Sequence, residues 1–95
     1  MAAYIILTKV SPQAMEAPED FKALAERVSH KIKEECPAVH WKESYATLGR
    51  FDVVDIVESE DQAQVERAAM IIRAQGHSTT ETMVATSWKE FLSNL

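Results

Sequence analysis

Residues 40–58 read HWKESYATLGRFDVVDIVE, and this stretch decides the fold because it holds two strand-like runs separated only by Gly49 and Arg50. A glycine at the first of two connecting positions is typical of a tight type II′ β-hairpin, since glycine tolerates the positive φ that this turn requires. The pattern therefore predicts one strand over 40–48 and a second over 51–58.

A two-residue turn would also fix which residues of the two strands lie opposite one another. One face would carry the pairs Leu48–Phe51, Ala46–Val53, Ser44–Asp55 and Lys42–Val57, with His40 continuing it. The other face would carry Thr47–Asp52, Tyr45–Val54, Glu43–Ile56 and Trp41–Glu58. We expect the first face to lie beneath helices, because its small residues leave room for close packing. The predicted interface with a partner molecule then consists of Trp41, Tyr45, Val54 and Ile56.

The sequence on either side of the hairpin predicts two long helices and two further strands. The β-branched run YIILTKV at 4–10 suits a buried strand. Between Pro18 and Pro37, an apolar stripe at helical spacing predicts an amphipathic helix. The sequence SEDQ at 59–62 reads as a capping box that opens a second helix, which Gly76 would close in a left-handed conformation. Residues 77–86 alternate as a last strand, and Ser87 would cap a short C-terminal helix that docks through Trp88, Phe91 or Leu92.

This order, β-α-β-β-α-β, predicts a single α+β domain over residues 1–95. Right-handed crossovers arrange the strands as an antiparallel sheet in the order 4-1-3-2, with both helices on one face. The other face would then be bare and half apolar. We expect a second copy of the chain to cover it, giving a homodimer or a higher homo-oligomer.

Composition excludes several classes of protein. The net charge of −5 argues against binding nucleic acid, and no run of residues is apolar enough to predict a membrane segment. The start MAAYIILTKV lacks the basic region of a signal peptide, and Cys36 is the single cysteine. We therefore expect a cytoplasmic protein without disulfides.

The most unusual residue is Asp55, a carboxylate in the middle of a strand on the face expected to lie beneath the helices. It could anchor a ligand or act as a general base with Ser44 opposite and His40 nearby, or it could make a purely structural hydrogen bond. Asp52 has the same two interpretations, as a cavity carboxylate or as a brace for the turn. The candidate ligand pocket comprises Asp55, Ser44, His40, Phe51 and Asp52. Histidine spacing predicts no metal site, and no motif predicts a cofactor.

The stretch TLGRFDVVDIVES resembles the signature of the GYD-domain family of small bacterial and archaeal proteins, with Gly49-Arg50-Phe51-Asp52 at the place of the family's Gly-x-Tyr-Asp. The N-terminal YIILTKV, the late TTETMVA and the terminal Glu90-Phe91-Leu92 extend the resemblance over nearly the whole chain. The resemblance implies a ferredoxin-like fold of the dimeric α/β-barrel kind and no established activity. Phe51 replaces the family's tyrosine, so no phenolic hydroxyl acts at this position.

Three functions remain open from the sequence. The first is an oligomeric domain that binds a small metabolite in a cleft between sheet and helices. The second, by analogy of fold alone, is a cofactor-free enzyme of the oxygenase or isomerase type. The third is a structural or regulatory assembly subunit without a ligand. A cleft of about 300–1,000 Å³, the usual size of a small-molecule site, would favour the first two over the third.

Overall fold

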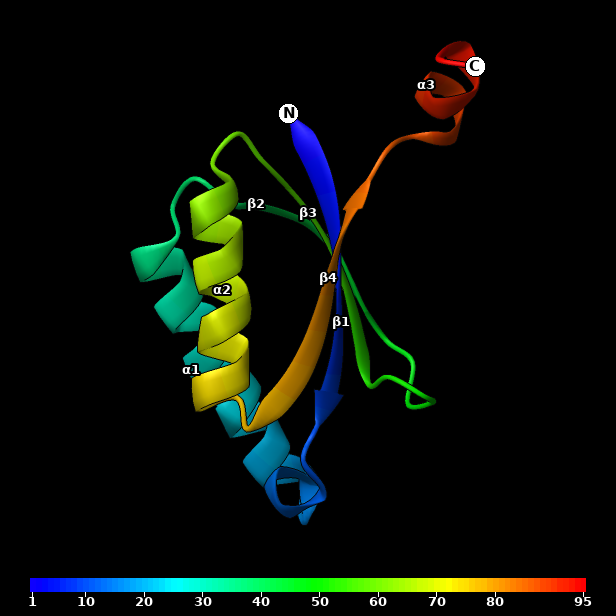
Figure 1. Ribbon diagram of the computed structural model, residues 1–95. Coiled ribbons are helices and arrows are strands. Elements are labelled where there is room, and N and C mark those ends of the chain that lie inside the picture. Colours follow the sequence, from blue (N-terminus) through cyan, green and yellow to red (C-terminus); the bar gives the residue numbers. More distant parts are fainter.

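The computed structural model describes residues 1–95 and has the predicted order of elements with one short addition. The strands are β1 (Ala2–Val10), β2 (His40–Ala46), β3 (Val53–Ser59) and β4 (Ser78–Ala85). The helices are α1 (Pro18–Glu35), α2 (Gln62–Gln75) and α3 (Trp88–Ser93), and a 3-10 helix, η1 (Pro12–Met15), precedes α1. Both long helices lie on the same side of the sheet (Figure 1).

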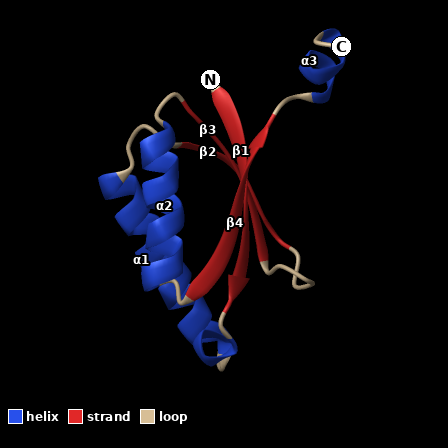
Figure 2. Ribbon diagram, in the orientation of Figure 1, coloured by secondary structure: helices blue, strands red, loops and turns tan.

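The four strands form one antiparallel sheet in the order β2-β3-β1-β4, which confirms the predicted order 4-1-3-2 and the ferredoxin-like α+β fold (Figure 2). Directly opposite residues of paired strands share a face of the sheet. The side beneath the helices carries Tyr4, Ile6, Thr8, Val53, Asp55 and Val57. The outer side carries Ile5, Leu7, Tyr45, Val54, Ile56 and Met83. The predicted assignment of Val53 and Asp55 to the helix side is therefore confirmed.

The hairpin keeps the predicted register in its central part but not in its turn. Ala46 pairs with Val53 and Ser44 with Asp55, as predicted. The strands end earlier than expected, however, because the Phe51 carbonyl accepts hydrogen bonds from both the Gly49 amide and the Thr47 hydroxyl. A loop over 47–52 replaces the type II′ turn, and the positive φ falls on Leu48, at 50°, rather than on Gly49.

A β-bulge in β2 overturns the predicted pairing at the start of this strand. The register shifts between Trp41 and Glu43, so that Lys42 is an extra residue and Trp41 lies opposite Val57. A bulge of one residue reverses the face of every side chain beyond it. Trp41 therefore lies on the helix side of the sheet, and its predicted place on the outer side, facing a partner molecule, is wrong. His40, which we had placed on the helix side, lies opposite Glu58 on the outer side.

The ends of α2 also differ in detail from the prediction. Asp61, rather than Ser59, caps the helix by accepting a hydrogen bond from the Gln64 amide, while Ser59 ends β3 and bonds to the Ala38 carbonyl. At the other end the left-handed conformation falls on His77, with φ at 49°, and not on Gly76. Gly76 is needed for a different reason, because a Cβ there would lie 2.4 Å from the Ile72 carbonyl oxygen.

The two long helices relate differently to the sheet. α2 packs closely on β4, whereas the close backbone contacts of α1 are mainly with α2 and η1. α3 extends from the end of β4 away from the rest of the molecule (Figure 1), so the predicted docking of its apolar side chains is wrong within one chain. Trp88 stacks only on Phe91, and both are exposed.

Candidate functional site

A cavity of about 530 Å³ lies where α1 stands away from the sheet. Nineteen residues line it, eleven of them hydrophobic, and they come mainly from α1 and from the helix side of β1, β2 and β3. The apolar stripe of α1 forms one wall, with Leu24, Val28 and Ile32. This volume lies within the range of small-molecule sites, and its mostly apolar lining with a few polar groups is typical of them.

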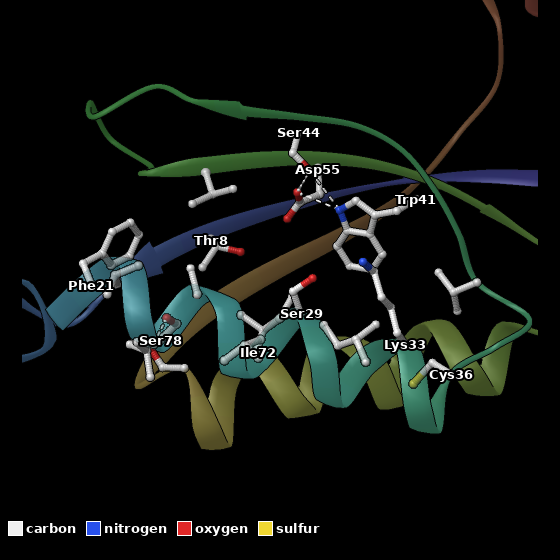
Figure 3. A pocket seen from close by; sticks show the side chains of 18 of the residues that line it. Thr8, Phe21, Ser29, Lys33, Cys36, Trp41, Ser44, Asp55, Ile72 and Ser78 are labelled. Carbon is white, nitrogen blue, oxygen red and sulfur yellow. Dashed lines mark hydrogen bonds between the residues drawn. The ribbon is translucent and has the colours of Figure 1, made fainter. Parts of the chain in front are cut away.

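The polar centre of the cavity is the carboxylate of Asp55, which points from β3 toward α1 (Figure 3). Its Oδ1 accepts a hydrogen bond of 2.6 Å from the Ser44 hydroxyl and one of 3.0 Å from the Trp41 indole N–H. The same indole N–H also lies 2.9 Å from Ser44 Oγ. Asp55 is only 6% exposed, and all its side-chain hydrogen bonds go to Oδ1, so Oδ2 is left to face the cavity.

Thr8 of β1 adds a second polar group without a partner. Its side chain lines the cavity and is 4% exposed, and its Oγ1 is the one buried side-chain polar atom that makes no hydrogen bond. Leaving a buried hydroxyl unpaired costs about 1–3 kcal/mol. The Thr8 side chain points from β1 into the cavity, on the same face of the sheet as Asp55 (Figure 3). This part of the cavity therefore holds an unpaired hydroxyl and a carboxylate that accepts hydrogen bonds through only one oxygen.

The α1 wall contributes two residues of different chemical character. Lys33 reaches from α1 toward the Trp41 ring and is exposed, which places a positive charge on the cavity wall (Figure 3). Cys36 lies at the C-terminal end of the helix and is buried, and this burial raises the pKa of its thiol above the ordinary value. A buried thiol with a raised pKa is a poor nucleophile. Cys36 is therefore part of the cavity wall rather than a reactive group.

The predicted pocket residues separate into two groups. The structure brings Asp55 and Ser44 together in the cavity, but His40, Phe51 and Asp52 do not line it. The bulge explains the displacement of His40, which is exposed on the outer side. Phe51 is half-buried in the loop, with the Arg50 guanidinium 5.9 Å from its ring centroid. These three residues are thus outside the cavity.

Of its two interpretations, Asp52 has the structural one. Its hydrogen-bond partners lie in β1, however, and not in the turn. Asp52 Oδ2 accepts a hydrogen bond of 2.8 Å from the Val10 amide, and its own amide donates to the Thr8 carbonyl. Lys9 Nζ lies 3.5 Å from Oδ1. Asp52 therefore extends the pairing of β1 and β3 beyond the last ladder residue.

Trp41 and Thr8 are the site residues that the sequence analysis missed. The alternation in YIILTKV carries a signal for Thr8, because it puts Thr8 on the same face as Tyr4, Ile6 and Val10, all buried. Trp41 has no comparable signal, since the bulge that turns it inward leaves no mark in the sequence. No group of three His, Cys, Asp or Glu side chains is arranged to hold a metal ion. None of the helices combines the length and the apolar character needed to cross a membrane.

The fold and its cavity define a small ferredoxin-like domain with a cavity between one helix and the sheet. The match of residues 4–95 to the GYD-domain family model shows that the chain belongs to this family. It is 27% identical to a Thermus thermophilus protein named "Glutamine synthetase and cystathionine beta-lyase binding protein", over 100% of this chain and 99% of that protein.

Two solved structures are similar in fold. The protein TTHA0845 from Thermus thermophilus matches with a TM-score of 0.60 at 21% identity, over 92% of this chain and 95% of that one. The leucine response regulatory protein LrpA of Mycobacterium tuberculosis matches with a TM-score of 0.59 at 17% identity. That match covers 90% of this chain but 51% of LrpA, so the chain spans about half of that protein. At these identities the likenesses show the fold alone.

Proposed function

We propose that this protein is an oligomeric domain that binds a small metabolite in the cavity between α1 and the sheet. The observation that supports the proposal best is the pair of unused polar atoms, Thr8 Oγ1 and Asp55 Oδ2, inside a cavity of about 530 Å³. A cavity that served only packing would have no reason to keep an unpaired hydroxyl in it. A bound molecule would satisfy both atoms.

Two matched substitutions on α1 test this binding function. Ala25 lines the cavity, whereas Ala23, two residues earlier, does not. Both are exposed, so phenylalanine at either position is tolerated by the fold, but only Ala25→Phe places a ring at the cavity. Native mass spectrometry of protein purified from its own host should show a retained ligand in the wild type and in Ala23→Phe, and less or none in Ala25→Phe. The same ligand-free mass for all three proteins would contradict the proposal.

The outer side of the sheet supports the self-association part of the proposal. No helix covers this side (Figure 1), and it carries Ile5, Leu7, Val54 and Ile56 together with the exposed Tyr45 and Met83. An apolar face of this kind on a domain of 95 residues is suited to a second copy of the same face across a two-fold axis. The interface proposed from the sequence is thus retained for Tyr45, Val54 and Ile56, without Trp41.

Analytical ultracentrifugation distinguishes this arrangement from a single-chain species. Ile56→Asp places a charge in the middle of the outer side and should lower the sedimentation coefficient of the wild-type assembly to that of one chain. Met70→Asp is the control, because Met70 is an exposed apolar residue of α2 on the opposite side of the molecule. If the wild type sediments as one chain at micromolar concentration, the self-association proposal is wrong.

The name of the Thermus relative favours a second candidate function, the binding of metabolic enzymes. The exposed side chains of α3, which projects from the body of the molecule, offer a segment for such a contact. Purified glutamine synthetase and cystathionine β-lyase from the same host would be titrated with the full chain and with Trp88→Ala in a calorimeter. This candidate predicts binding that Trp88→Ala weakens, and heats of dilution alone would exclude both enzymes as partners.

A further inference from the structure

We propose that the ligand of the cavity is a primary monoamine with an apolar body, whose ammonium group lies against Asp55 Oδ2 and Thr8 Oγ1. This inference rests on the proposed binding function and adds the chemical class of the ligand. It follows from three features: a buried carboxylate without a cation, an unpaired hydroxyl beside it, and the apolar wall opposite.

The two buried carboxylates of the protein differ in their partners. Asp52 is 5% exposed and has both a backbone amide on Oδ2 and the Lys9 ammonium near Oδ1. Asp55 is equally buried but has only the neutral donors Trp41 and Ser44, both on Oδ1, and forms no salt bridge. A buried carboxylate is costly unless it is paired and hydrogen-bonded. Asp52 shows how the fold completes such a group, and a cation from outside the chain would complete Asp55 in the same way.

An ammonium group also fits the hydroxyl. It carries three donor hydrogens and no acceptor, so it can donate to more than one oxygen at once. Asp55 Oδ2 and Thr8 Oγ1 both line the cavity and both lack a donor. A carboxylate ligand would leave Asp55 facing a like charge, and a purely apolar ligand would leave both oxygens unpaired.

The other residues that line the cavity determine which body the amine ligand can have. Phe21, Leu24 and Val28 on α1 and Val39 before β2 present apolar surface. Because Lys33 also lines the cavity, a second positive charge on the ligand would be repelled. These contacts favour one amine on an aliphatic or aromatic body over a polyamine.

Three probes of similar shape separate the amine from its alternatives: phenethylamine, phenethyl alcohol and phenylacetate. Binding is followed at neutral pH through Trp41 fluorescence in the Trp88→Phe variant, which leaves Trp41 as the single tryptophan because the chain has two. Trp88 does not line the cavity, and it lies on α3, which projects from the end of β4 on the side of the sheet away from α1 (Figure 1). We expect phenethylamine to bind at least about tenfold more tightly than either analogue, as a charged hydrogen bond in a buried site would give.

Variants of the two oxygens complete the test. Asp55→Asn should bring the amine and the alcohol to within about twofold of each other, and Thr8→Val should weaken the amine by a few-fold. The wild-type series needs no variant at Asp55, so the inference stays testable if Asp55→Asn does not fold. Equal binding of amine and alcohol, or tighter binding of phenylacetate, would overturn the amine class while leaving a binding cavity. No binding of any probe, together with a ligand-free protein from the host, would overturn the proposed function as well.

Discussion

α1 and α2 lie on the same face of the same sheet (Figure 1), yet the backbone of α2 comes close to β4 and that of α1 does not come as close to any strand. The buried side of α2 includes the small residues Ala68 and Ala69, which let its backbone approach β4. The buried side of α1 consists of Leu24, Val28 and Ile32, and a cavity remains between these side chains and β3. Close packing therefore depends on the size of the side chains in the apolar stripe and not only on its period.

The surface of the sheet beneath α1 adds to this difference between the helices. Below α1 the sheet presents Asp55, and an aliphatic stripe offers it no hydrogen bond. Its hydrogen-bond donors lie instead on the neighbouring strand, at Trp41 and Ser44 of β2. The carboxylate is thus hydrogen-bonded within the sheet and only through one oxygen, and the space between it and α1 remains open.

The largest expected effect compares a fully packed position on α2 with a position on α1 that borders the cavity. Ile71 of α2 and Ile32 of α1 belong to the same core and are almost equally exposed, at 7% and 6%, but only Ile32 lines the cavity. Ile71→Ala should lower the free energy of unfolding by about 3–4 kcal/mol, because it leaves a new closed void. Ile32→Ala should cost about 2 kcal/mol, because it only enlarges a space that already exists. Urea denaturation measures both, and equal losses would show that the α1 side is packed as tightly as the α2 side.

A smaller effect is expected at the end of α2, where the chain turns into β4. Gly76→Ala should lower the free energy of unfolding by about 2 kcal/mol, because the new Cβ would lie 2.4 Å from the backbone oxygen of Ile72. Gly49 in the hairpin loop is the control, since nothing lies within 4 Å of a Cβ at that position. Gly49→Ala should change stability by less than about 0.5 kcal/mol. Thermal melting compares the two, and a larger loss at Gly49 would mean that the loop, not the turn into β4, is the tighter place.

The sequence predicted the fold well because the fold depends on features that are repeated along the chain. Strand alternation and helical stripes gave the order of elements, and crossover handedness gave the sheet order. Features that depend on a single residue were predicted less well. The positive φ values fall on Leu48 and His77 and not on Gly49 and Gly76, since local hydrogen bonds and the space around Gly76 decide these conformations.

The site was predicted in part for the same reason. Asp55 and Ser44 were placed together because register carries over from the paired centre of the hairpin. Trp41 and His40 were exchanged between faces because one extra residue, Lys42, reverses the alternation beyond it. The distance between α1 and the sheet depends on how the apolar side chains of α1 pack against three strands at once, and no local sequence pattern encodes this.

The smallest effect concerns the ion pair that joins α1 to α2. Glu35 near the end of α1 accepts hydrogen bonds from Lys31, at 2.6 Å, and from Arg67 of α2, at 2.7 Å. These two bonds, with that from Lys31 the larger, lower the pKa of Glu35 below its ordinary value. A carboxylate with a lowered folded pKa stabilises the protein above the ordinary glutamate pKa of about 4.3, and the contribution is lost as the pH falls through the folded pKa.

Glu35→Gln should therefore reduce stability slightly at neutral pH and lose this difference from the wild type in acid, as measured by urea denaturation at a series of pH values. Glu26→Gln on the same helix is the control, since Glu26 forms no salt bridge, and it should show no such pH-dependent difference. A deficit in Glu35→Gln that stays constant from neutral to acidic pH would mean that the packing of the side chain, rather than its charge, ties α1 to α2. α1, which borders the cavity, would then be held against α2 by side-chain packing alone, and its distance from the sheet would not depend on pH.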